Sequence, residues 1–329
     1  MNQSDAPESL GGDSSTASSP EILSATPGPV PAVPKWFRAF PYFLSAFLFL
    51  SSLFALFAPL PLLLLSFRPQ GRRWAWLAAL TNTLLVTWVA QSLGTAVYAI
   101  VVVVPALLLP ELMKRKRSLE LSTGLTLVAV FVTAFLAFAA YAHGQHAAPF
   151  VQLKLEISNF FDLLFKSLTE DAKSSLLENI TQEEFKESLL SLFPARAVIF
   201  VLAMIWLNII LVLRLNPERI REQMGLQPSY FSRWKVPEWF IWPTIIAGFS
   251  MLREWGWPSD LGKNFFEVSK AVYAIQGLSI LTFFLDAWTV RGIFRMFAYL
   301  LGIVLMLPIV QALGFFDLWF DFRAKLRQS

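Results

Sequence analysis

The sequence predicts an all-α protein, a polytopic integral membrane helix bundle of about eight transmembrane helices (about seven to nine), with an amphipathic helical insert. After residue 35 the chain is a series of long apolar runs, and about 18 apolar residues suffice to cross the ~30 Å hydrocarbon layer as a helix. Hydrophobic residues make up 56% of the chain and charged residues only 15%, and the mean hydropathy is +0.56. Most breaks between the runs hold Arg and Lys, as loops on the cytoplasmic side of a membrane do.

Residues 1–34 differ from the rest, because they are rich in Ser, Pro, Gly and Ala and contain four acids but no Lys or Arg. Such a segment cannot bury enough apolar surface to offset its ordering entropy, so we expect a disordered N-terminal tail. The basic and apolar regions of a secretory signal are missing from its start. The transmembrane domain is expected to cover residues 35–323, followed by a C-terminal tail at 324–329.

The first apolar run, residues 39–66, is interrupted by Pro59 and Pro61. It predicts either one tilted, kinked helix or a span followed by a short broken piece. The other expected spans cover residues 74–93, 96–113, 121–141, 194–213, 238–252, 265–288 and 293–316. A short turn at Gly94 is expected between the second and third spans, and Pro194 suits the first turn of the fifth. Trp residues flank the short sixth span, as interfacial anchors do.

A long polar interval at residues 142–193 is predicted to be an extracytoplasmic amphipathic helical insert. Its apolar residues recur at steps of three or four, which indicates a helix with one apolar face: Phe150, Leu153, Ile157, Phe160, Leu164 and Leu168. Thr181 and Glu184 have the spacing of a capping box. Two helices are expected, either as a connector whose apolar face packs on the spans or as a lid or docking site for a partner.

The positive-inside rule places the loops at 68–73, 114–117 and 214–235 in the cytoplasm and the acidic insert outside. The rule fails at both ends of the chain, where basic residues flank the first and last runs. Counting 39–66 as two passes would bring the N-terminus inside, and a half-crossing at 308–314 would do the same for the C-terminus. The sidedness of both termini stays open.

Polar side chains within spans are candidates for function, because an ionisable group at mid-membrane is costly. In the seventh span such residues step by three along one side of the helix: Asn264, Glu267, Lys270, Tyr273 and Gln276. With Asn208 of the fifth span, four of them form the candidate substrate-binding set: Asn264, Lys270, Tyr273, Gln276 and Asn208. The alternatives are a surface pair of Glu267 with Lys270, and interhelical hydrogen bonds for the amides. Ala271, Ala274 and Gly277 offer a small-residue face for a neighbouring helix.

Other polar residues in the spans have simpler explanations. Asp286 is expected to pair with Arg291 or Arg295 at the membrane interface. Asn82 and Gln91 are single amides, for which interhelical hydrogen bonds are expected.

Several function classes find no support in the sequence. The chain has no Cys and only two His residues, His143 and His146, so neither a metal site nor another cofactor is expected. No nucleophile elbow, phosphate loop or HExxH motif is present, so we expect no enzymatic activity. Nucleic-acid-binding motifs are also missing, and the basic loops have a topological explanation.

The C-terminal third resembles a known family. The residues that carry this resemblance are Phe231 to Glu238, Asn264, Tyr273 to Ser279, Leu313 to Asp317 and Asp321 to Arg323. They are similar to those of the YybS-like bacterial membrane proteins, a domain of unknown function, and the likeness extends more weakly back to Phe40. The resemblance implies a multi-pass protein of the bacterial cytoplasmic (inner) membrane. It also implies a distant similarity to the S-components of energy-coupling-factor vitamin transporters and to the rod-shape protein MreD.

These resemblances imply two alternative functions for proteins that share this arrangement of helices. The first is uptake of a small molecule, such as a vitamin or metabolite, with a ligand near Gln276 and an ATPase module as partner. The alternative is a non-catalytic membrane scaffold or assembly factor in a cell-envelope complex, which would bind another membrane protein. Fold analogy cannot choose between them.

Overall fold

A computed structural model describes most of the chain after residue 34. The described residues are 35–68, 71–169, 177, 181–215, 222–223, 226, 230–253 and 256–326. The predicted disordered tail and residues 170–176 and 178–180 of the insert lie outside them. Residues 1–38 and 39–329 form two separate units, and the account below concerns the second.

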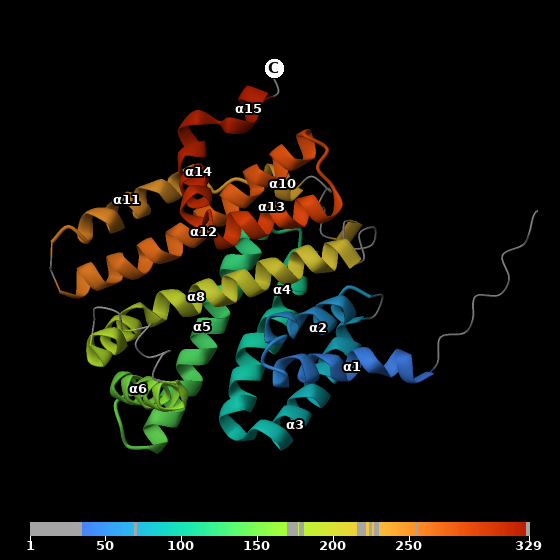
Figure 1. Ribbon diagram of the computed structural model, residues 1–329. Coiled ribbons are helices and arrows are strands. Elements are labelled where there is room, and N and C mark those ends of the chain that lie inside the picture. Colours follow the sequence, from blue (N-terminus) through green and yellow to red (C-terminus); the bar gives the residue numbers. More distant parts are fainter. Residues whose placement is uncertain are drawn as a thin grey trace, which may run out of the picture. The chain divides into compact units, whose positions relative to one another are not determined.

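The described residues are almost entirely helical and contain no strand, which confirms the all-α prediction (Figure 1). The first helices are α1 (Lys35–Leu50), η1 (Ala55–Phe57), α2 (Pro59–Ser66), α3 (Gly71–Val97), the π-helix η2 (Tyr98–Val103), α4 (Val104–Lys114), α5 (Leu119–Gly144) and α6 (Pro149–Ser167). The others are α8 (Gln182–Leu215), α10 (Tyr230–Arg233), η3 (Glu238–Phe240), α11 (Ile241–Ser250), α12 (Trp257–Ala287), α13 (Gly292–Val304), α14 (Leu307–Phe320) and α15 (Phe322–Leu326).

The number of spans is smaller than predicted. Within the described residues, four helices are long and apolar enough to cross a membrane: Gly94–Lys114, Leu119–Gly144, Gln182–Leu215 and Trp257–Ala287. The pair α13 and α14 adds a fifth if these helices, bent by 90° at the break between them, count as one span. The structure therefore supports four or five spans, where the sequence predicted about eight.

Three of the predicted spans fail for identifiable reasons. The run at 39–66 is divided between α1, η1 and the eight-residue helix α2, so the short broken piece of the second alternative is present, whereas one kinked helix is not. Helix α11 has ten residues, which rise about 15 Å, only half of the hydrocarbon thickness. Helix α3, which contains Thr and Asn among its apolar residues, is not among the described helices that are both long and apolar enough to cross a membrane.

Two predicted helix boundaries are also wrong. Gly94 lies inside α3 instead of in a turn, since a single Gly costs a helix only about 1 kcal/mol. Pro194 lies in the interior of α8 instead of its first turn, and the backbone groups that it disturbs find partners elsewhere, as described below. The predicted capping box is confirmed, because the Glu184 carboxylate accepts from Thr181 N at 2.8 Å and Thr181 Oγ1 accepts from Glu184 N at 3.2 Å.

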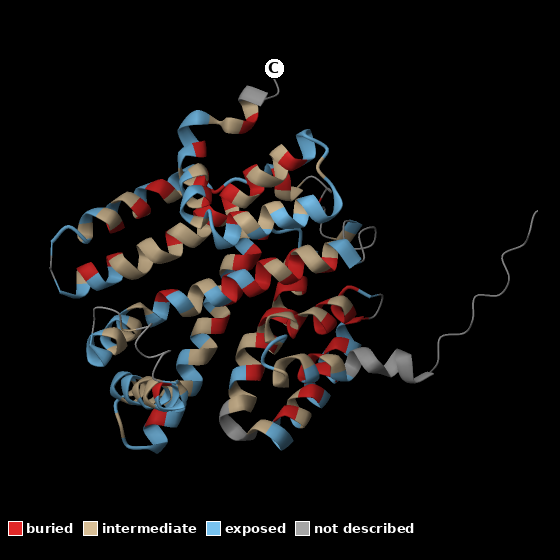
Figure 2. Cartoon of the chain, in the orientation of Figure 1, coloured by how far each residue is buried: buried red, intermediate tan, exposed pale blue. Residues whose placement is uncertain are grey.

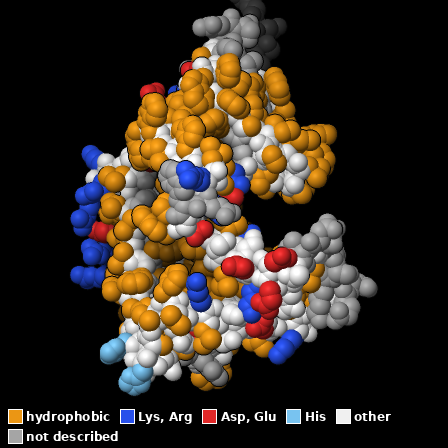
Figure 3. Space-filling view, turned by 90° about the vertical axis from the view of Figure 1, so that its left-hand side faces the viewer, with side chains coloured by type: hydrophobic (Ala, Val, Ile, Leu, Met, Phe, Trp, Pro, Cys, Tyr) orange, Lys and Arg blue, Asp and Glu red, His pale blue; other side chains and the backbone are white. Residues whose placement is uncertain are grey.

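Much of the exposed surface is apolar, as expected for helices that face lipid. Figure 2 shows buried residues concentrated in α2 and the middle of α8, whereas α6 is largely exposed. Only 17% of the apolar window of α5 is buried. In Figure 3 hydrophobic side chains cover most of the face shown, and Lys and Arg gather along one edge.

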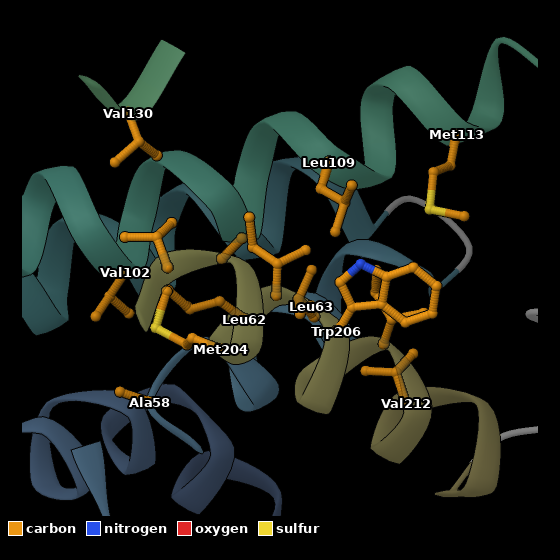
Figure 4. Packing of buried hydrophobic residues seen from close by; sticks show 14 of the residues in the cluster. Ala58, Leu62, Leu63, Val102, Leu109, Met113, Val130, Met204, Trp206 and Val212 are labelled. Carbon is orange, nitrogen blue, oxygen red and sulfur yellow. The ribbon is translucent and has the colours of Figure 1, made fainter. Parts of the chain in front are cut away.

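A hydrophobic core lies between α2, the η2–α4 segment and α8. Figure 4 shows Leu62 and Leu63 of α2 pointing toward Leu109 of α4 and toward Met204 and Trp206 of α8. Helix α8 also contacts α12, so it connects this N-terminal group of helices with the C-terminal group of α11, α12 and α14.

Helices α12 and α14 approach each other closely through two glycines. A Cβ atom on Gly277 would overlap the carbonyl oxygen of Val310, and one on Gly314 would overlap that of Tyr273. The predicted small-residue face of α12 is therefore confirmed at Gly277, and the helix that it admits is α14.

Candidate functional site

A buried cluster of polar side chains lies where the ends of α14 and α15 meet the middle of α12. Asp317 belongs to the last turns of α14, and Asp321 then adopts a left-handed conformation with φ of 36°. The chain therefore turns back, and Arg323 Nη2 donates to Asp317 Oδ2 at 2.6 Å. The two side chains are 5% and 0% exposed, which makes this a buried ion pair.

Arg323 also holds the segment that follows α10. Its Nη1 atom donates to the carbonyl oxygens of Ser232, at 3.3 Å, and Trp234, at 3.0 Å. Ser279 of α12 donates to the same Trp234 oxygen at 3.0 Å, and its hydroxyl oxygen lies 3.2 Å from Arg323 Nη1. The guanidinium group thus binds the 232–234 backbone, α12 and α14 together.

Gln276 of α12 completes the cluster. Its Oε1 atom accepts from the backbone N–H of Val236 at 3.0 Å, and its Nε2 atom donates to Asp317 Oδ2 at 3.0 Å. A cavity of about 10 Å³ beside it is lined by Val236, Pro237, Glu238, Ile241, Tyr273, Gln276, Gly314 and Leu318. This volume is about the minimum that one water molecule needs.

An exposed ion pair closes the outer side of the cluster. Lys235 Nζ lies 2.9 Å from Asp321 Oδ1, and both side chains are about half exposed. The hydrogen bond from Lys235 lowers the pKa of the Asp321 carboxyl, because it favours the charged form more strongly than partial burial opposes it.

A second polar contact ties the same segment to α5. Glu120 Oε1 accepts from the Tyr230 hydroxyl at 2.7 Å and from the Trp234 indole N–H at 2.8 Å. Burial, together with the neighbouring Glu120 carboxylate, raises the pKa of Tyr230, so its hydroxyl stays protonated and donates.

Of the five predicted site residues, only Tyr273 and Gln276 border the small cavity. Asn264, near the start of α12, inserts its amide into α8 instead. Its Oδ1 atom accepts from Ala195 N at 2.9 Å, and its Nδ2 atom donates to Ser191 O at 2.8 Å. These two backbone groups would pair with each other in an undisturbed helix, so Asn264 bridges the turn that Pro194 opens.

The remaining two lie elsewhere. Lys270 pairs with Glu267 at 2.6 Å on a partly exposed face, as the surface alternative predicted. Asn208 Nδ2 donates to Leu56 O in η1 and to Met204 O, both at 2.7 Å. The five residues thus do not gather around one cavity, and their assignment to substrate binding stays a prediction.

The other interpretations of polar residues can be compared with the structure in the same way. Asp286 pairs with Arg295 at 2.5 Å, as predicted. Asn82 accepts from Ala46 N at 2.7 Å, which confirms an interhelical bond between α3 and α1. The side chain of Gln91 lies outside the described residues. No group of three or more His, Asp or Glu side chains suited to a metal occurs in the described part of the chain.

Sequence reasoning missed the centre of the cluster. Asp317 follows directly on the predicted eighth span, and Arg323 is one of the basic residues that flank the last apolar run, without a predicted partner. One signal was available, since both residues belong to the short stretches that carry the family resemblance. Their pairing depends on the reversal at Asp321, which is not visible in a hydropathy pattern.

The apolar helices, the lipid-facing surface and the buried ion pair together define a multi-pass helical membrane protein. Residues 41–318 match the model of the family described as "Predicted membrane protein (DUF2232)". The chain belongs to this family. No curated protein and no solved structure matches it.

Proposed function

We propose that this protein is a non-catalytic scaffold or assembly factor in a cell-envelope complex of the bacterial cytoplasmic membrane. One observation carries the proposal: the amide of Gln276 beside the cavity and the carboxylate of Asp317 already have hydrogen-bond partners within the protein. Both ends of the Gln276 amide are occupied, and so are both oxygens of Asp317. Such a cluster serves to hold helices together.

The uptake function is the competing hypothesis, and the size of the cavity counts against it. Pockets for small molecules have volumes of about 300–1,000 Å³, whereas the cavity beside Gln276 has about 10 Å³. Binding a vitamin there would require the bonds of Gln276 to Val236 and Asp317 to open. The distant similarity to transporter S-components is implied only by the family resemblance, and it would support uptake only by analogy of fold.

A docking surface for the partner is offered by α6 within the predicted insert. Lys186 of α8 pairs with Asp162 of α6 at 3.0 Å, and the rings of Phe165 and Phe185 are in edge contact at 5.7 Å. These contacts fix α6 to the start of α8. The exposed apolar residues of α6 include Phe160 and Leu163, which are 62% and 66% exposed.

Crosslinking in the native membrane, followed by mass spectrometry, tests the scaffold function. We expect one membrane protein in stoichiometric amount, and we expect it to be lost from the variant Phe160→Ser/Leu163→Ser. The matched control Phe294→Ser/Phe297→Ser, which changes two exposed residues of α13, should retain the partner. Recovery of the chain alone from the wild type would contradict the proposal.

Ligand screening tests the uptake function in parallel. If the scaffold proposal is right, no vitamin or metabolite should raise the unfolding temperature of the purified protein. A ligand that raises it in the wild type but not in Gln276→Ala would favour uptake instead.

A further inference from the structure

Two basic loops that are distant in the sequence meet at one end of the helices. Arg72, at the start of α3, lies 3.8 Å from Glu111 Oε1 of α4, and Arg115 lies 3.4 Å from the same oxygen. Lys114 Nζ donates to Ser66 O at the end of α2, at 2.7 Å. The two loops predicted to share the cytoplasmic side thus lie close together, with Glu111 between Arg72 and Arg115.

This junction carries a large excess of positive charge. Its exposed cations, which we call the basic patch, are Arg72, Arg73, Lys114, Arg115, Lys116 and Arg117. Glu111 is the carboxylate that pairs with them, and its side chain is 31% exposed. Because Arg72 and Arg115 both approach one carboxylate oxygen, their nitrogen atoms lie no more than about 7 Å apart, a gap that one phosphate group can bridge.

The position of the basic patch along the helices identifies its partner. Lys114 is the last residue of one candidate span, and the next begins at Leu119. Trp74 and Trp76, close to Arg72 in α3, are 51% and 56% exposed, as indoles at a membrane interface are. Cations at the ends of two spans, beside exposed indoles, lie at the depth of the lipid headgroups.

We propose that the basic patch is a binding site for the phosphate headgroup of an anionic phospholipid. The guanidinium groups of Arg72 and Arg115 bind the phosphate from two sides, because Arg forms paired hydrogen bonds with phosphate oxygens. The remaining cations add attraction from nearby. Binding of the headgroup should stabilise the folded state, because only the folded protein brings the two loops together.

The test measures the unfolding temperature of the full-length protein in detergent micelles supplied with phosphatidylglycerol or with phosphatidylcholine. We expect phosphatidylglycerol to raise it and phosphatidylcholine to leave it unchanged. In Arg72→Gln/Arg115→Gln the apparent affinity for phosphatidylglycerol should fall about 5-fold per charge removed. The variant Lys154→Gln/Lys166→Gln, which removes two exposed cations of α6, should keep the wild-type affinity.

Two further arms separate this site from simpler explanations. Glu111→Gln should bind phosphatidylglycerol more tightly, because it removes the carboxylate that competes with the phosphate. Equal stabilisation by inorganic phosphate at the same concentration would overturn the choice of a lipid. Equal stabilisation by both lipids, or equal losses in the two double variants, would overturn the site itself and leave the basic loops as topological signals only.

Discussion

Breaking the buried ion pair should destabilise the protein more than any other single change in the cluster. At the 2.6 Å separation of Arg323 Nη2 and Asp317 Oδ2, with an effective dielectric constant of about 20, the attraction is roughly 6 kcal/mol before desolvation. Asp317→Asn keeps the shape of the side chain and removes its charge. The Arg323 cation then stays buried with only carbonyl and hydroxyl partners, which costs about 3–5 kcal/mol.

The measurement is thermal unfolding in a mild detergent, followed by Trp fluorescence. Trp234 lies within the cluster, and its backbone carbonyl accepts from Arg323. A loss of about 3 kcal/mol corresponds to a fall of roughly 6–12 °C in the unfolding temperature. The unfolding temperature of the Arg323→Met variant should fall by a similar amount, since this change leaves the carboxylate of Asp317 without its cation.

The double variant decides whether pairing is the cause. In Asp317→Asn/Arg323→Met neither charge remains, so the loss should be smaller than the sum of the two single losses by about 2 kcal/mol or more. Losses that add to within about 0.5 kcal/mol would show that the two residues act independently. That result would refute the interpretation that the Asp317–Arg323 ion pair holds the cluster together.

Three further predictions follow from neighbouring contacts, each checked by thermal unfolding. Asn264→Ala should cost about 2–3 kcal/mol, because it leaves one N–H and one carbonyl of α8 unpaired; a change below about 0.5 kcal/mol would contradict this. Gly277→Ala should cost about 1–3 kcal/mol through overlap with α14, whereas Gly124→Ala, where a Cβ meets nothing within 4 Å, should not destabilise. The pKa of Asp321 is lowered by Lys235, so the stability that the pair adds is present above the ordinary carboxyl pKa of 3.8 and is lost as pH falls through the lower folded value. The wild type should therefore exceed Asp321→Asn in unfolding temperature at pH 6, and the difference should vanish in strong acid; a constant difference would exclude this pair as the cause.

Hydropathy predicted the helical class and the long helices correctly, because spans such as α5 and α12 are long and apolar enough to stand out. It overestimated the number of spans, because a run of apolar residues does not reveal where the backbone stops being one straight helix. In residues 39–66 the break at η1 leaves α2 with eight residues. Between α13 and α14 a 90° bend divides the last run, for which the sequence left open either one span or a half-crossing at 308–314.

Local patterns were reliable where the partners are close in sequence. The Thr181 capping box and the Glu267–Lys270 pair join residues within one turn of helix, and the Asp286–Arg295 pair joins residues nine positions apart. The contacts of Arg323 with Trp234 and Ser279 could not be predicted in this way, since the three residues come from three separate segments. In the sequence these residues stood out only because they belong to the stretches that carry the family resemblance.

The polar residues of the spans share one physical explanation that the sequence does not contain. In lipid, a backbone group without a partner costs several kcal/mol, since no water can replace the lost bond. Asn208 bonds to η1, where the chain between α1 and α2 is not a regular helix. Asn264 bonds to the turn that Pro194 opens, and Gln276 bonds to the non-helical segment at Val236. Each amide thus lies opposite an irregular stretch of backbone, and its hydrogen bonds give it a structural role there.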